Sequence, residues 1–153
     1  MLTFPHSLVA LAIFKLFPPG SAFFLAFISH FVLDFCVPHW NPHFYTEFHQ
    51  DKKVSTPSIK IAFIDSLASG FLTLFFVLQA FPNWSKMAGY ILVVFFALLP
   101  DLIEIPYYFF GCQQKWLKTY VRFEHQHQAS ANVFWGSLTQ VVTILAAIRL
   151  LLL

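Results

Sequence analysis

The residues that could do chemistry in this chain are acids and histidines placed among apolar residues. Four of the seven acids fall within long apolar stretches: Asp34, Asp65, Asp101 and Glu104. A charged side chain near the middle of a membrane costs at least about 2.5–3.5 kcal/mol, so each acid needs a partner, a proton or a polar pocket. No Lys or Arg lies in the middle of these stretches. A bound metal cation is therefore the simplest partner.

Two pairs of these residues have helical spacing. His30 and Asp34 are four residues apart, so on a helix both side chains face the same way. Such a pair is often an ordinary hydrogen bond, but within an apolar stretch we give a ligand role more weight. Asp101 and Glu104 follow Pro100, and neighbouring carboxylates repel unless they share a proton or a cation. The alternative is a Pro-kinked helix whose acids face water.

The histidines lie on the same side of the expected membrane bundle as these acids. His6 begins the first apolar stretch, His39 lies in a Pro-rich turn, and His125 precedes the last stretch. Solvated rings at a membrane interface are the alternative interpretation for the last two. One convergent polar site explains the distribution of acids and histidines together. The candidate metal ligands are His6, His30, Asp34, His39, Asp101 and His125.

Imidazole and carboxylate ligands together suit zinc, manganese or iron (Zn, Mn or Fe) better than calcium or magnesium. The candidate ligands are numerous enough for one or two ions. A divalent transition metal of this kind activates bound water and polarises a phosphoryl oxygen. Hydrolysis also needs a general base, and the remaining acids, Glu104 and Asp65, are the candidates for that catalytic role or for further ligands.

Three short motifs point to a known family. Phe4-Pro5-His6-Ser7, Ser29-His30 with Asp34, and Leu98-Leu99-Pro100-Asp101 resemble motifs of the small membrane-bound metal-dependent hydrolases of inner membranes, which are loosely similar to zinc-dependent phospholipase C. The resemblance implies a helical protein with several spans, in which histidines and aspartates near one membrane face bind metal. Residue by residue, it implies ligand roles for His6, His30, Asp34 and Asp101.

The composition identifies the setting in which these residues must be positioned. The 153 residues are 58% hydrophobic and 10% charged, whereas a typical soluble domain is about 45–50% apolar and about 25% charged. This excludes an ordinary soluble globule and a disordered chain. The net charge of +2, without a long basic stretch, argues against a nucleic-acid partner.

The apolar stretches predict an all-α, polytopic transmembrane bundle that forms a single membrane domain over residues 1–153. We expect about five spans and an interfacial amphipathic helix. The first stretch is short, because fourteen residues rise only about 21 Å against a hydrocarbon core of about 30 Å. Whether it fully crosses is left open. The expected spans are residues 4–17, 20–37, 58–81, 87–110 and 132–153.

Basic residues predict the orientation of these spans. With five crossings, six of the nine Lys and Arg lie on the side of the N-terminus and of the two long polar segments. This favours a cytoplasmic N-terminus in a prokaryotic inner membrane. On the segment 113–123, Lys115, Lys118 and Arg122 share one helical face, which suits an interfacial helix whose cations attract a lipid phosphate.

These features together predict a membrane-embedded, metal-dependent hydrolase. Its substrate would be a lipid or another amphiphilic ester, above all a phosphoester, at the cytoplasmic face. One alternative is a proton- or metal-ion-coupled transporter, since intramembrane acids and histidines also form ion pathways. The other is a non-catalytic scaffold whose buried polar cluster holds the helices together. The expected partner is membrane lipid.

Overall fold

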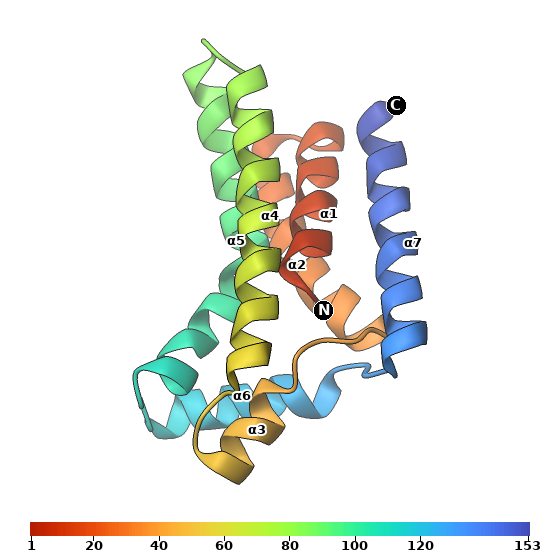
Figure 1. Ribbon diagram of the computed structural model, residues 1–153. Helices are drawn as coiled ribbons and strands as arrows, with labels where there is room; N and C mark the ends of the chain where they lie inside the picture. The colour runs from red at the N-terminus through yellow and green to blue at the C-terminus, as the bar shows by residue number, and fades with distance from the viewer.

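The computed structural model describes all 153 residues and contains seven helices and no strands (Figure 1). This confirms the all-α prediction. Five apolar helices begin and end within three residues of the predicted spans, and two shorter helices lie in the polar segments. The helices are α1 (Thr3–Leu16), α2 (Pro19–Cys36), α3 (Phe44–Asp51), α4 (Thr56–Gln79), α5 (Trp84–Phe109), α6 (Lys115–His127) and α7 (Val133–Leu152).

The protein is an integral membrane protein. Four helices, α2, α4, α5 and α7, are long and apolar enough to cross a membrane, whereas α1 has only 14 residues. Large apolar side chains remain exposed on the outside of these helices, as lipid-facing surfaces require; Phe71 on α4, for example, is 69% exposed. The fifth crossing stays a prediction.

The helices form an up-and-down arrangement with a distinct polar end. The α1–α2 turn, the α4–α5 turn and the C-terminus lie at one end of the bundle, and α3 and α6 lie at the other (Figure 1). Small residues fill the contact of α1, α2 and α5: Ala10, Ala26 and Ala97 are fully buried. Small side chains allow helices to approach closely in a membrane, where apolar burial drives no association.

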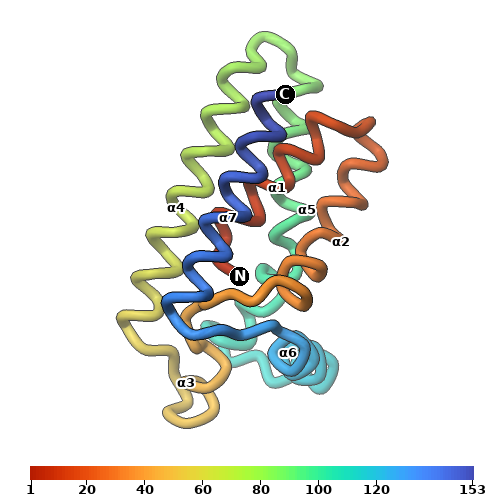
Figure 2. The backbone as a smooth tube through the Cα atoms, turned by 90° about the vertical axis from the view of Figure 1, so that its right-hand side faces the viewer, coloured from red at the N-terminus to blue at the C-terminus, as the bar shows by residue number.

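Helix α1 begins inside the bundle rather than at its edge. Both views place the N-terminus near mid-height, between the other helices (Figures 1 and 2). The residue before α1, Leu2, has no side chain that can cap the helix. The Asp65 carboxylate of α4 accepts instead from the backbone N–H groups of Thr3 at 2.5 Å and Phe4 at 3.2 Å. A carboxylate at this position also favours the positive end of the helix dipole.

Helix α5 changes direction toward the polar end of the bundle. Pro100 and Pro106 lie inside it and donate no backbone hydrogen bond. Figure 1 shows the lower part of α5 turning away from α4. Because α1 starts only half-way along the bundle and α5 turns outward, the lower half of α4 has no continuous helix packed against its inner face.

Candidate metal centre

Three histidines surround one aspartate where α1, α2 and the loop after α2 meet. The side chains of His6, His30, His39 and Asp34 are all buried. The Asp34 carboxylate lies 3.0 Å from His6 Nε2, 3.7 Å from His30 Nε2 and 3.9 Å from His39 Nε2. The structure thus brings four of the six predicted ligands to one point.

Local geometry explains why these side chains converge. His30 and Asp34 share one face of α2 through their four-residue spacing, as predicted. The rings of His6 and His30 stack with centroids 4.2 Å apart. His39 is held by its backbone, which pairs with Ala129 and Ala131 through two hydrogen bonds of 2.9 Å. The segment after α6 therefore fixes the loop that carries His39.

Two of the histidines are oriented as metal ligands commonly are. His30 Nδ1 lies 2.8 Å from the carbonyl oxygen of Ala97, and His39 Nδ1 lies 2.8 Å from that of Val37. A carbonyl only accepts, so each Nδ1 carries a proton and donates it to the carbonyl, while each Nε2 faces Asp34 and in the neutral ring has the lone pair that a metal ligand needs. Backbone carbonyls that fix the ring in this way are typical outer partners of ligating histidines.

The spacing of the ligand atoms fits a small cation. Bonds of about 2.0–2.2 Å in a tetrahedral zinc site place ligand atoms about 3.3–3.6 Å apart. The distances between the histidine nitrogens and Asp34, 3.0–3.9 Å, bracket this range. His6 adds a second indication, because its Nδ1 is buried without a hydrogen-bond partner. The residues present therefore fit a transition metal.

An ammonium group lies at the centre of this cluster. The Met1 amine is 2.6 Å from Asp34 Oδ1 and 2.7 Å from His39 Nε2. The cluster thus favours positive charge where these two side chains converge. A metal at the same place would displace the amine or take its neutral form as a ligand. Burial lowers the pKa of His39 to about 4, so its Nε2 is unprotonated near neutral pH and can accept from the amine.

Acids from α5 and α6 extend the cluster. Asp101 Oδ1 lies 3.8 Å from His30 Nε2, and its side chain is 46% exposed. Two sets of ligand atoms lie within 4.8 Å of one another: His6, His30 and Asp101 in one, and His30, Asp34 and Glu124 in the other. Because His30 belongs to both, these two sets describe adjoining parts of one centre.

Glu124 is a site residue that the sequence reasoning missed. It is buried on α6 and accepts a hydrogen bond from the Tyr120 hydroxyl at 3.0 Å. Burial raises the pKa of this carboxyl. The sequence contains a signal for it, because the spacing of Leu117, Val121 and Glu124 places them on one helical face. The structure shows that this face is buried. That face points to the bundle and carries Glu124 with it.

Several predicted site residues do not join the histidine cluster, although His125 and Asp65 line the cavity beside it. His125 is exposed and stacks on Tyr45 with ring centroids 4.0 Å apart, so its ring does not join the cluster. The Asp65 carboxylate, a predicted general base, accepts the backbone hydrogen bonds that cap the start of α1. The basic residues of α6 are exposed and line no part of the cavity beside the cluster: Lys115, Lys118 and Arg122.

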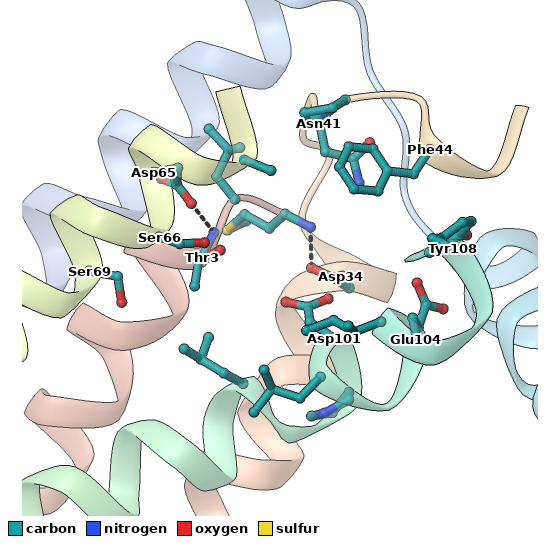
Figure 3. A pocket seen from close by; sticks show the side chains of 18 of the residues that line it. Thr3, Asp34, Asn41, Phe44, Asp65, Ser66, Ser69, Asp101, Glu104 and Tyr108 are labelled. Atoms are coloured by element: carbon teal, nitrogen blue, oxygen red, sulfur yellow. Dashed lines mark hydrogen bonds and ion pairs between the residues drawn. The ribbon is translucent and has the colours of Figure 1, made fainter. Parts of the chain in front are cut away.

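A cavity of about 890 Å³ adjoins the centre. Figure 3 shows Asp34, Asp101 and Glu104 at one side of it and Asp65 and Ser69 of α4 at the other. Glu104 lies one turn after Asp101, and its carboxylate has no hydrogen-bond or ion-pair partner within the protein. Of the two predicted catalytic carboxylates, Glu104 is therefore the one without a partner in the protein.

No known protein family, curated protein or solved structure matches the chain. The fold and the site define a class in physical terms: an all-α integral membrane protein in which histidines and acids converge on a cavity.

Proposed function

We propose that the protein is a membrane-embedded, metal-dependent hydrolase of a lipid or another amphiphilic phosphoester at the cytoplasmic face. One observation carries the proposal. The Nε2 atoms of His6, His30 and His39 lie within 4 Å of the Asp34 carboxylate, beside a cavity that a substrate can enter. The short motifs around His6, His30 and Asp101 support the same activity by resemblance.

His6, His30, His39 and Asp34 would hold the metal, with Glu124 completing the ligand set, since its ligand atom lies within 4.8 Å of those of His30 and Asp34. A bound zinc, manganese or iron ion supplies activation of water and polarisation of a phosphoryl oxygen. The Ala97 and Val37 carbonyls keep two imidazoles in the ligating tautomer. The buried walls of the cluster exclude bulk water, which strengthens the electrostatic interactions inside it.

Glu104 is the general base of this proposal. It faces the cavity one helical turn from Asp101 and has no competing partner (Figure 3). It takes a proton from the attacking water and returns it to the leaving oxygen. A positioned acid–base group of this kind contributes about 10²–10⁴-fold to the rate.

A structural role is the second candidate, and one observation favours it. The ion pair between the Met1 amine and Asp34 already neutralises the most buried acid of the cluster. A scaffold would need no more than such pairing. This alternative gives no role to Glu104, which has no partner. It also gives none to the buried Nδ1 of His6, which has no hydrogen-bond partner.

Hydrolysis in reconstituted vesicles tests the proposal. The purified protein is placed in vesicles of phosphatidylethanolamine and phosphatidylglycerol, and released headgroups and acyl chains are measured by mass spectrometry. We expect turnover that a chelator removes and that Glu104→Gln lowers by about 10²–10⁴-fold. Asp51→Asn, at the exposed end of α3, is the matched control and keeps full turnover. Absence of turnover, or turnover insensitive to both the chelator and Glu104→Gln, contradicts the proposal.

A further inference from the structure

The cavity beside the centre continues as an apolar slot between two helices. On α4 its lining runs from Ile59 to Val77, and on α5 from Ile91 to Phe109. At 1.5 Å per residue each run is about 27 Å long, close to the thickness of about 30 Å of a hydrocarbon core. A volume of about 890 Å³ holds about thirty methylene-sized groups if each takes the roughly 30 Å³ of a liquid water. This is large enough for an acyl chain together with a small polar group.

The slot opens sideways, toward the surface that faces lipid. Three of its apolar lining residues are also prominent on the outside of the protein: Phe63 is 61% exposed, Ile91 54% and Leu74 49%. A molecule already dissolved in the bilayer can therefore reach the centre without passing through water. Smaller side chains of α4, Ser66, Ser69 and Gly70 among them, line the inner part of the same slot.

The polar end of the cavity has an unbalanced negative charge. Five carboxylates line the cavity, and no Lys or Arg does: Asp34, Asp65, Asp101, Glu104 and Glu124. Asp34 is paired with the Met1 amine, and Asp65 with the start of α1. Glu124 belongs to the proposed ligand set, where the metal would offset its charge, whereas Asp101 and Glu104 have no fixed cation. The basic residues on the exposed face of α6 line no part of this cavity.

We propose that the cavity binds one phospholipid whose headgroup carries a primary amine, with an acyl chain in the slot between α4 and α5 and the amine at the half-exposed carboxylate of Asp101. The proposal rests on the proposed function in that it names the substrate class of the same site. An ammonium donates hydrogen bonds to carboxylates and offsets their charge, whereas an anionic headgroup adds to the repulsion. The lipid phosphate then lies between the amine and the histidine cluster.

Lipid binding, rather than turnover, tests this inference. The detergent-purified protein is mixed with phosphatidylethanolamine or phosphatidylglycerol of the same acyl chains, and the bound lipid is measured by native mass spectrometry. We expect a preference of at least about tenfold for the ethanolamine lipid, because a hydrogen bond between charged groups contributes that factor or more. Asp101→Asn should reduce this preference. Equal binding of the two lipids, or a preference for phosphatidylglycerol, overturns the proposal.

A steric variant tests the location of the chain. Gly70 lines the slot, and a Cβ there meets no atom within 4 Å, so Gly70→Leu adds a side chain at the slot without a clash. Gly20→Leu is the matched control, since Gly20 also has open space but lies outside the cavity. We expect Gly70→Leu alone to lower lipid binding by at least about tenfold, the effect of losing a few buried methylene groups. Unchanged binding in Gly70→Leu overturns the proposed slot.

Labelling of the unmodified protein keeps the test independent of any variant. An ethanolamine lipid with a diazirine in its acyl chain should label α4 and α5 in a saturable manner, and α7 only in proportion to concentration. Saturable labelling confined to other helices contradicts the slot. Metal content is measured in the same samples. Lipid binding without metal refutes only the proposed metal chemistry, and metal without selective lipid binding refutes only this inference.

Discussion

Replacing Asp65 by alanine tests whether this carboxylate caps α1 or acts in catalysis. The variant removes the acceptor of two backbone N–H groups, those of Thr3 at 2.5 Å and Phe4 at 3.2 Å. Hydrogen bonds to a charged group contribute about 1.5–3 kcal/mol each. Asp65 is only partly buried, and water satisfies part of the loss, so we expect Asp65→Ala to lower the free energy of unfolding by about 3 kcal/mol.

Asp65→Asn separates the two roles further. Asparagine retains one neutral acceptor for these N–H groups and therefore loses less stability, about 1–2 kcal/mol. The free energy of unfolding is measured in mixed micelles by titration with a denaturing detergent, and Asp51→Ala at the exposed end of α3 is the control. Unfolding free energies within about 0.5 kcal/mol of the wild type for both Asp65 variants, with turnover abolished, would refute the capping interpretation and restore Asp65 as a catalytic candidate.

Two further predictions concern the polar end. Burial opposes ionisation of Glu47, but hydrogen bonds from Ser55 and neighbouring groups outweigh it and lower its pKa. The wild type should therefore be more stable than Glu47→Gln above pH 4.5, the ordinary pKa of a glutamate, and this advantage should disappear as the pH falls below that value. Thermal melts across pH 3–7 can measure the difference, and a constant difference would contradict this. A Cβ at Gly136 would fall on the Trp40 backbone nitrogen, so Gly136→Ala should displace the loop that carries His39 and lower metal content. Elemental analysis can measure this against Gly20→Ala, where a Cβ meets no atom within 4 Å; unchanged content would contradict it.

The spanning helices were predictable because each follows from a long, continuous run of apolar residues. An apolar run bounded by Pro or polar residues determines a span almost alone, and the observed ends differ from the predicted ones by three residues or fewer. The pairing of His30 with Asp34 was predictable for the same reason, since four-residue spacing is a local property of a helix.

The parts that the sequence reasoning missed depend on helix phase or on distant contacts. The prediction of His125 as a ligand ignored the buried face of α6, which carries Glu124 and whose phase is set by Leu117 and Val121. The role of Asp65 was not readable at all, because its partner Thr3 lies 62 residues away. Such contacts follow from tertiary packing, which no local pattern encodes.

The predicted lipid-binding role of the α6 cations is also changed by the structure. Lys115, Lys118 and Arg122 share an exposed face, as their spacing indicated. They line no part of the cavity, so any attraction of theirs for lipid phosphate acts at the membrane surface. Selection of the lipid in the cavity falls to carboxylates instead.

The metal content of the purified protein tests the central claim most directly. The wild type, His30→Gln and His49→Gln are purified in detergent without chelator, and zinc, manganese and iron are counted per chain. His30 lies in the cluster, whereas His49 lies exposed on α3 and serves as the control. We predict one or two ions per chain in the wild type and in His49→Gln, and loss of most of this metal in His30→Gln. A wild type without stoichiometric metal, or the same metal content in all three proteins, would contradict the account.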